Sequence, residues 1–164
     1  MLRPVILFAS MLLTALSAGL LFAYACSVNP GLHRLPDPAY LAAMQHINRA
    51  IQNPVFFISF MGPVILLPWS AWLEYRSSKT AFRYLLGAAL LYVFGVFGVT
   101  ILGNVPLNEA LESFDLVGVS PERMTAQRSA FEAPWGSWHL VRTVAAVISA
   151  GLALAAAFSN KAGN

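Results

Sequence analysis

Four long apolar segments constrain the fold of this chain more than any other feature of its sequence. Each is close to the roughly 20 residues that a helix needs to cross the hydrocarbon core of a bilayer. They cover residues 4–28, 54–73, 82–103 and 139–158. Lipid offers no hydrogen-bond partners to backbone N–H and C=O groups, so continuous runs of this kind span a membrane as helices. We therefore predict an all-α fold, a polytopic membrane four-helix bundle.

The composition agrees with a membrane protein. Only 10% of the residues are charged and 58% are hydrophobic, whereas soluble domains carry about a quarter charged residues. Small residues recur at four-residue spacing in the first and fourth segments, which lets helix backbones approach closely in lipid. We expect residues 1–164 to form a single integral membrane domain in contact with membrane lipid. It could form a homo-oligomer or join a larger membrane complex.

The N-terminal segment could be mistaken for a cleaved signal peptide. Ala23-Tyr24-Ala25-Cys26 faintly resembles a cleavage site. However, the uncharged run from Pro4 to Val28 is too long for a signal-peptide core and long enough to span. We predict a retained first helix.

Several classes of function are excluded by what the sequence lacks. Cys26 is the only cysteine, which rules out an internal disulfide and a thiol–disulfide relay. The spans show no paired histidines for haem and no metal-ligand cluster, so we predict no metal site. Phosphate-binding and nucleophile-elbow motifs are absent. The few basic residues lie at span ends, where topology explains them, so no nucleic-acid partner is expected.

The distribution of basic residues predicts the orientation. They flank the spans at the N-terminus, in the second loop and in the tail, as Arg3, Arg76, Lys79, Arg83 and Lys161. The third loop is mainly acidic. By the positive-inside rule, both termini lie in the cytoplasm and the first and third loops lie outside, in a bacterial inner (cell) membrane. Arg34 and Arg49 of the first loop count against this orientation.

Both outer loops carry signals for additional short helices. Asp37-Pro38 predicts an N-cap and a helix to about Asn53, lying across the mouth of the bundle as an interfacial helix or as a lid. In the third loop, Gly103 and Pro106 predict the end of the third span. A second short helix is expected from Pro121 to about Phe131, with a break at Pro134 and a new start capped by Ser137.

Polar side chains from three separate segments gather at the outer end of the predicted bundle. They are Gln45 and Asn48, Asn104 and Asn108, and His139 and Arg142. Buried polar groups are costly unless they are hydrogen-bonded. The cluster therefore indicates either a mutual network or a ligand-binding pocket.

His139 and Arg142 share one helix face, because they are three residues apart. Arg142 falls in the first turn of the fourth span, and an intramembrane arginine marks a functional site by default. The alternative is an interfacial anchor, in which Trp135 and Trp138 sit at the headgroups and Arg142 snorkels back toward them.

Three sequence blocks resemble the anthrone oxygenase-like family of small four-helix membrane proteins. The blocks are Met44-Gln45-x-x-Asn48-x-x-Ile51-x-Asn53-Pro54, Gly103-Asn104-Val105-Pro106-Leu107-Asn108 and Trp138-x-x-x-Arg142. The resemblance covers nearly the whole chain. It implies a monooxygenase that oxidises an anthrone to an anthraquinone with molecular oxygen, with no metal, flavin or other cofactor. Most bacterial members of the family are uncharacterised.

The residues allow roles to be assigned on this hypothesis. The substrate would be a flat, lipophilic anthrone-like or polyketide-type aromatic at the outer membrane face. His139 is the candidate base, as the cluster's only titratable group with a pKa near neutrality. Arg142, with Asn104 and Asn108, would stabilise the developing oxyanion. The remaining candidates bind substrate: Gln45 and Asn48 position it, and Trp135 and Trp138 stack on it.

A second class of function remains open. The chain could be a non-catalytic membrane protein that binds a small lipophile or quinone, or an accessory subunit of a membrane complex. An enzyme needs the polar cluster to line a cavity, whereas a structural subunit would close the cluster with internal hydrogen bonds.

Overall fold

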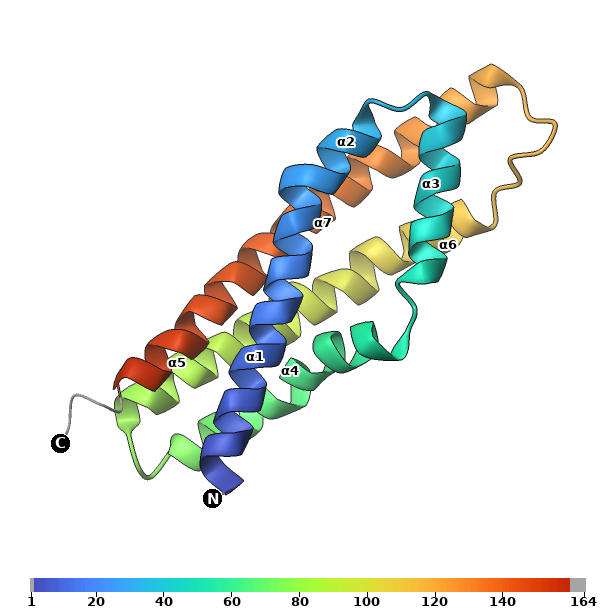
Figure 1. Ribbon diagram of the computed structural model, residues 1–164. Coiled ribbons are helices and arrows are strands. Elements are labelled where there is room, and N and C mark those ends of the chain that lie inside the picture. Colours follow the sequence, from blue (N-terminus) through green and yellow to red (C-terminus); the bar gives the residue numbers. More distant parts are fainter. Residues whose placement is uncertain (1, 160–164) are drawn as a thin grey trace.

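The computed structural model describes residues 2–159, and every regular element in this part of the chain is a helix. Four continuous helical segments are long and apolar enough to cross a membrane: Leu2–His33, Pro54–Glu74, Lys79–Glu112 and Pro121–Ser159. They pack lengthwise into a bundle in which α1 begins and α7 ends at the same end (Figure 1). The predicted all-α membrane bundle is confirmed. Lys161, one of the basic residues that predict the orientation, lies outside the described residues.

Two of the four segments pass through π-helical turns. The first consists of α1 (Leu2–Ala23), η1 (Tyr24–Val28) and α2 (Asn29–His33), and the third of α5 (Lys79–Leu90), η2 (Leu91–Gly98), η3 (Thr100–Asn104) and α6 (Val105–Glu112). The others are α4 (Pro54–Glu74) and α7 (Pro121–Ser159), and a separate helix, α3 (Asp37–Ala50), precedes α4. π-Helical turns are often found at functional sites.

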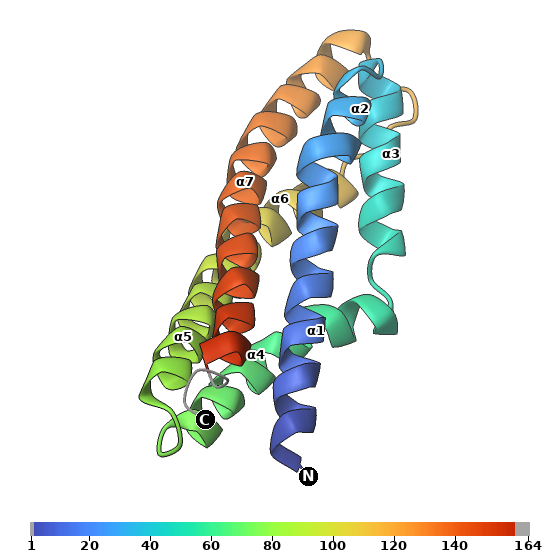
Figure 2. The same cartoon turned by 60° about the vertical axis from the view of Figure 1, so that its left-hand side comes forward.

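The fourth position of the bundle is shared by two helices in succession (Figure 2). In the half where α1 begins and α7 ends, which we call the terminal half, the core is built from α1, α4, α5 and α7, with Leu67, Leu85 and Ala146 fully buried. In the opposite half, which we call the loop half, α3 takes the place of α4. There Tyr40 and Met44 of α3 pack against α6 and α7. The expected helix across the bundle mouth therefore runs along the bundle instead.

The third span does not end at Gly103, so that prediction is wrong. The helix continues through η3 into α6, and the Val105 N–H bonds to the Thr100 carbonyl five residues back. This wide turn leaves Pro106 in the first turn of α6, where a proline's missing N–H is tolerated. Gly103 serves packing: a Cβ there would lie 2.6 Å from the ring of Trp138.

The predicted break at Pro134 is also wrong, because α7 runs unbroken from Pro121 to Ser159. Phe131, Trp135 and His139 stack in sequence along one face of α7 and hold the helix together across the proline. Their ring centroids are separated by 6.1 Å and 4.9 Å. The Ser137 hydroxyl donates to the Ala133 carbonyl (3.0 Å) within this helix rather than capping a new one.

Asp37 does not cap α3 with its side chain, contrary to prediction. Instead its carboxylate accepts hydrogen bonds from Thr125 and from Arg128 of α7, the latter at 3.0 Å. These two donors hold the pKa of Asp37 below its usual value. Arg128 also donates to the carbonyls of His33 (2.8 Å) and Leu35 (2.7 Å), so it fastens the turn between α2 and α3 to α7.

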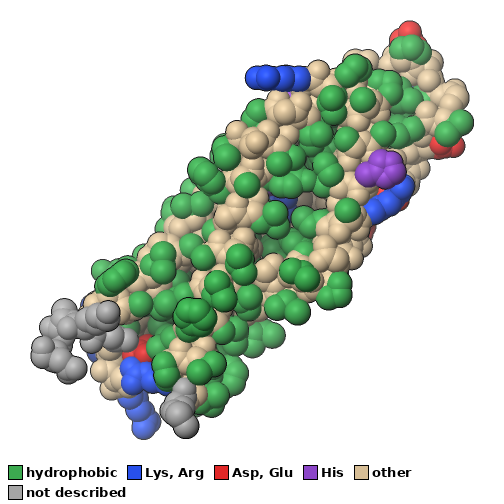
Figure 3. Space-filling model, in the orientation of Figure 1, with side chains coloured by type: hydrophobic (Ala, Val, Ile, Leu, Met, Phe, Trp, Pro, Cys, Tyr) green, Lys and Arg blue, Asp and Glu red, His purple; other side chains and the backbone are tan. Residues whose placement is uncertain are grey.

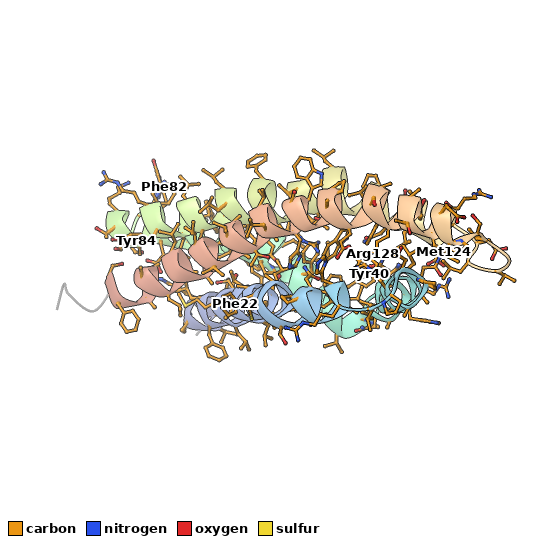
Figure 4. All side chains as sticks on the ribbon, turned by 90° about the horizontal axis from the view of Figure 1, so that it is seen from above. Phe22, Tyr40, Phe82, Tyr84, Met124 and Arg128 are labelled. Atoms are coloured by element: carbon orange, nitrogen blue, oxygen red, sulfur yellow. The ribbon has the colours of Figure 1, made fainter. Side chains whose placement is uncertain are left out.

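Arg128 additionally covers the ring of Tyr40, with the guanidinium carbon 4.4 Å from the ring centroid (Figure 4). Burial raises the pKa of the Tyr40 hydroxyl. The loop half is thus held together by an arginine-centred network in addition to its apolar core.

α7 has 39 residues, which is about 58 Å at 1.5 Å per residue and well beyond a hydrocarbon core of about 30 Å. Part of the loop half therefore extends past the hydrocarbon region.

Candidate functional site

A cavity of about 550 Å³ opens where α3 ends and α4 begins. Its wall is formed by α1 and η1, by the α3–α4 junction, by η3 and α6, and by α7. Figure 3 shows the hollow on the face between α1 and α3, with one basic side chain visible inside it. Arg142 is the one Lys or Arg in the cavity wall, within the described residues. Asn53 fixes the junction by accepting a hydrogen bond from the Phe56 N–H (3.1 Å) as the N-cap of α4.

His139 lies in the cavity wall and is only 2% exposed. Its Nε2 is 3.2 Å from the carbonyl oxygen of Leu21, and its Nδ1 is 3.3 Å from Nε and 3.1 Å from Nη2 of Arg142. A carbonyl can only accept and a guanidinium can only donate. The geometry therefore fixes His139 as a neutral imidazole with its proton on Nε2 and its lone pair directed at Arg142.

Arg142 makes only neutral contacts. Besides His139, its Nη1 donates to the Thr100 hydroxyl (3.3 Å), which itself donates to the Val96 carbonyl (2.7 Å). Its guanidinium carbon lies 5.3 Å from the ring centroid of Trp135. Between residues 2 and 159, no carboxylate forms an ion pair with it. The three contacting residues lie in the cavity wall, Thr100 on η3 and the other two on α7. A partly buried cation without a counter-ion is costly in a membrane protein and favours a ligand that supplies a negative oxygen.

Trp135 is held from both sides. Its indole N–H donates to the Asn108 side-chain oxygen (2.7 Å), and its carbonyl accepts from the Asn104 amide (3.1 Å). Its ring stacks on His139 with an interplanar angle of 8°. This packing fixes the orientation of the imidazole next to the cavity.

The comparison with family models matches residues 56–152 to the anthrone oxygenase family. The chain belongs to this family. Neither the curated proteins nor the solved structures give a match. The matched range runs from the first turn of α4 into α7 and includes η3 and the stacked residues Trp135 and His139. The name of the family indicates an oxidoreductase.

The structure divides the eight candidate site residues into two groups. Five line the cavity: Asn48, Asn108, Trp135, His139 and Arg142. The other three lie outside its wall. The Gln45 amide donates to the carbonyls of Leu111 and Phe114 (both 2.9 Å), Asn104 binds the backbone of α7, and Trp138 is 43% exposed beside Gly103. The cluster is thus partly a closed network and partly a cavity lining.

Two buried amide atoms have no hydrogen-bond partner among the described residues. They are Nδ2 of Asn48, in the cavity wall, and Oδ1 of Asn104. No group of three or more His, Cys, Asp or Glu side chains that could hold a metal ion occurs in residues 2–159.

Sequence reasoning missed several parts of the cavity wall. Tyr24 and Thr100 line it from the two π-helical segments, and Phe56, Phe57 and Phe60 form an aromatic wall on α4. A tyrosine near a span end ordinarily indicates an interfacial anchor. Their inward direction depends on the π turns, which shift the helix phase and leave no clear mark in the sequence.

Proposed function

We propose that the chain is a cofactor-independent oxygenase for a flat, lipophilic aromatic of the anthrone or polyketide type. The observation that carries this proposal is the pair formed by Arg142 and neutral His139 on the wall of the cavity. The pair offers a cation for a substrate oxygen beside a group able to take a proton. The family membership supports the same reaction class.

The first step is proton removal from carbon. In an anthrone, the CH₂ group lies opposite the ketone, and loss of a proton gives an aromatic enolate. When the substrate oxygen reaches Arg142, the guanidinium transfers its hydrogen bonds from the imidazole to that oxygen. Because this frees the lone pair on Nδ1, His139 becomes able to accept the C–H proton. Arg142 then stabilises the enolate oxygen.

The electrons pass directly from substrate to oxygen. The enolate gives one electron to O₂, the resulting carbon radical and superoxide combine, and a carbon–oxygen bond forms. The peroxide is protonated and loses water, which leaves a second ketone. One substrate and one O₂ therefore yield one quinone and one water.

The cavity suits such a substrate. Its volume of about 550 Å³ lies within the range of about 300–1,000 Å³ typical of small-molecule sites. Phe56, Phe60 and Trp135 offer apolar surface for an aromatic ring system. By the positive-inside rule, Arg76, Lys79 and Arg83 favour a cytoplasmic terminal half, so we propose that the cavity lies at the outer face of the inner (cell) membrane.

Oxygen uptake by the detergent-purified protein tests this function, with an anthrone as substrate and the spontaneous rate subtracted. Its absorption spectrum would be recorded first. We expect uptake that falls by about 100-fold or more in His139→Ala and Arg142→Ala. Tyr84→Phe, on α5 and outside the cavity, is the matched control. A wild-type rate equal to background would reject the oxygenase, and tight anthrone binding without uptake would favour a lipophile-binding protein. A visible absorption band from a bound cofactor would reject a cofactor-independent reaction.

A further inference from the structure

The last step of the proposed reaction needs an acid and a base at the same moment. In the hydroperoxide, a base removes the remaining C–H proton, the C–H electron pair forms the C=O bond, and the O–O bond breaks. The departing hydroxide requires a proton from an acid. His139 cannot fill both roles together, because its single lone pair takes the C–H proton while its Nε2–H is directed at the Leu21 carbonyl.

Most other O–H and ring N–H donors in the cavity wall are already committed to protein acceptors. Thr100 donates to the Val96 carbonyl (2.7 Å), Ser113 to the Ala110 carbonyl (3.0 Å) and Trp135 to Asn108 (2.7 Å). The carboxylates Glu109 and Glu112 are exposed, and Glu112 forms an ion pair with Arg49 (2.7 Å). Amide groups of Asn and Gln hold their protons too tightly to act as acids.

Tyr24 is the exception. Tyr24 lines the cavity wall, and its hydroxyl forms no hydrogen bond with any other residue that the structure describes. By contrast, the Tyr92 hydroxyl in the terminal-half core donates to the Phe60 carbonyl (3.0 Å) and is also hydrogen-bonded to the Ser17 hydroxyl (2.7 Å). A phenol carries a proton that it can transfer, which an amide does not.

The position of Tyr24 fits this role. It begins η1, and its ring meets the His139 ring edge-on, with centroids 5.9 Å apart and an interplanar angle of 60°. One turn earlier on the same segment, the Leu21 carbonyl accepts from His139. The first helical segment thus orients the base and places an uncommitted phenol beside it.

We propose that Tyr24 is a catalytic acid that protonates the hydroxide leaving during O–O cleavage. The proposal rests on the proposed oxygenase function. His139 takes the second C–H proton while Tyr24 gives its phenolic proton to the leaving oxygen, which departs as water. The imidazolium then returns its proton to the Tyr24 phenolate. Both residues end in their starting protonation states, and the net reaction of this step converts one hydroperoxide into one ketone and one water.

The elimination step can be assayed by itself with 9-hydroperoxyfluorene, a flat hydroperoxide that carries the required C–H bond. Its conversion to fluorenone would be followed for the wild type, Tyr24→Phe and Tyr84→Phe, with a protein-free background subtracted. We expect Tyr24→Phe to lower this rate by about 100-fold and Tyr84→Phe to leave it unchanged. In Tyr24→Phe, oxygen uptake with an anthrone should stay within a few-fold of wild type while hydroperoxide accumulates and less quinone is formed.

The outcomes separate this proposal from the proposed function. A wild type without oxygen uptake would reject the oxygenase. An active wild type whose Tyr24→Phe variant eliminates water at the normal rate would reject the role of Tyr24. If Tyr24→Phe does not fold, site-specific 3-fluorotyrosine at position 24 keeps the shape and makes the phenol more acidic. An elimination rate that changes while oxygen uptake does not would then support the role, and an unchanged rate would overturn it.

Discussion

The guanidinium of Arg142 lies against Nδ1 of His139, at 3.1 Å from Nη2 and 3.3 Å from Nε. The group proposed to bind the substrate oxygen therefore also covers the lone pair of the proposed base. On our proposal, substrate binding and activation of the base are one event, because the hydrogen bond that moves to the substrate is the one that frees His139. Before substrate binds, the same contact with Arg142 keeps Nδ1 of His139 from being protonated.

Replacing Arg142 by methionine should separate stability from activity. The substitution removes a cation that has no carboxylate partner among the described residues. Replacing even a paired buried charge and its partner by apolar groups of similar volume is often neutral or stabilises a protein by about 1–4 kcal/mol. We expect a higher unfolding midpoint, followed by tryptophan fluorescence, together with loss of oxygen uptake. Arg83→Met, at an exposed position of α5, serves as the control with little effect. A lower midpoint for Arg142→Met would show that the guanidinium contributes to folding.

Thr100 should act as a positioning residue for Arg142. Thr100→Val keeps the shape but removes the hydroxyl that accepts from Nη1, at a cost of about 1 kcal/mol, which corresponds to roughly fivefold in rate. We expect kcat for oxygen uptake to fall by this amount with KM nearly unchanged. Thr100→Ser should restore most of the rate. If the serine and valine variants are equally impaired, the methyl group and not the hydroxyl matters.

The contact between Gly103 and Trp138 should limit the size of both residues. Because an added Cβ would lie 2.6 Å from the indole, Gly103→Ala should destabilise the protein by about 1–3 kcal/mol. Trp138→Leu should relieve much of this cost in the double variant. The four unfolding free energies form a double-mutant cycle. Strictly additive effects would contradict a direct clash between the two positions.

The loop half should loosen in acid. The pKa of Asp37 is depressed by Thr125 and Arg128, so its contribution is fully present above its unfolded value of about 3.9. It is lost as the pH falls through the lower folded pKa. We expect the protection of α3 amides from hydrogen exchange, relative to their intrinsic rates, to fall only below about pH 4. Asp37→Asn should remove that acid step and show faster exchange already at neutral pH. An acid transition of equal size in both proteins would assign it to another group.

The four spans could be predicted because lipid imposes a length and a composition that a sequence displays directly. Gly103, Pro106 and Pro134 misled the prediction because breaker rules describe a helix by itself. Here a π-helical turn accommodates Pro106, and the stack of Phe131 and Trp135 bridges Pro134. Neither the π-helical turn nor the ring stack can be predicted from the breaker residue alone.

The candidate site was only partly predictable for a different reason. Gln45 and Asn48 are three residues apart on α3, yet one binds the backbone carbonyls of the third loop region and the other lines the cavity. The two side chains project from α3 in directions about 60° apart around the helix axis. Which of them faces the cavity depends on how α3 is rotated in the bundle. Tyr24 and Thr100 escaped notice because the phase of their helices changes at η1 and η3.

The succession of α3 and α4 in one bundle position has a consequence for how this scaffold could diversify. The gap between the two helices is bridged only by residues 51–53, while α3 is fastened at its far end through Arg128. A change in the length of this short bridge would alter the dimensions of the cavity and leave the four membrane spans and the His139–Arg142 pair unchanged. Selection, or a protein engineer, could therefore retune the accepted molecule by inserting or deleting a residue between Ile51 and Pro54.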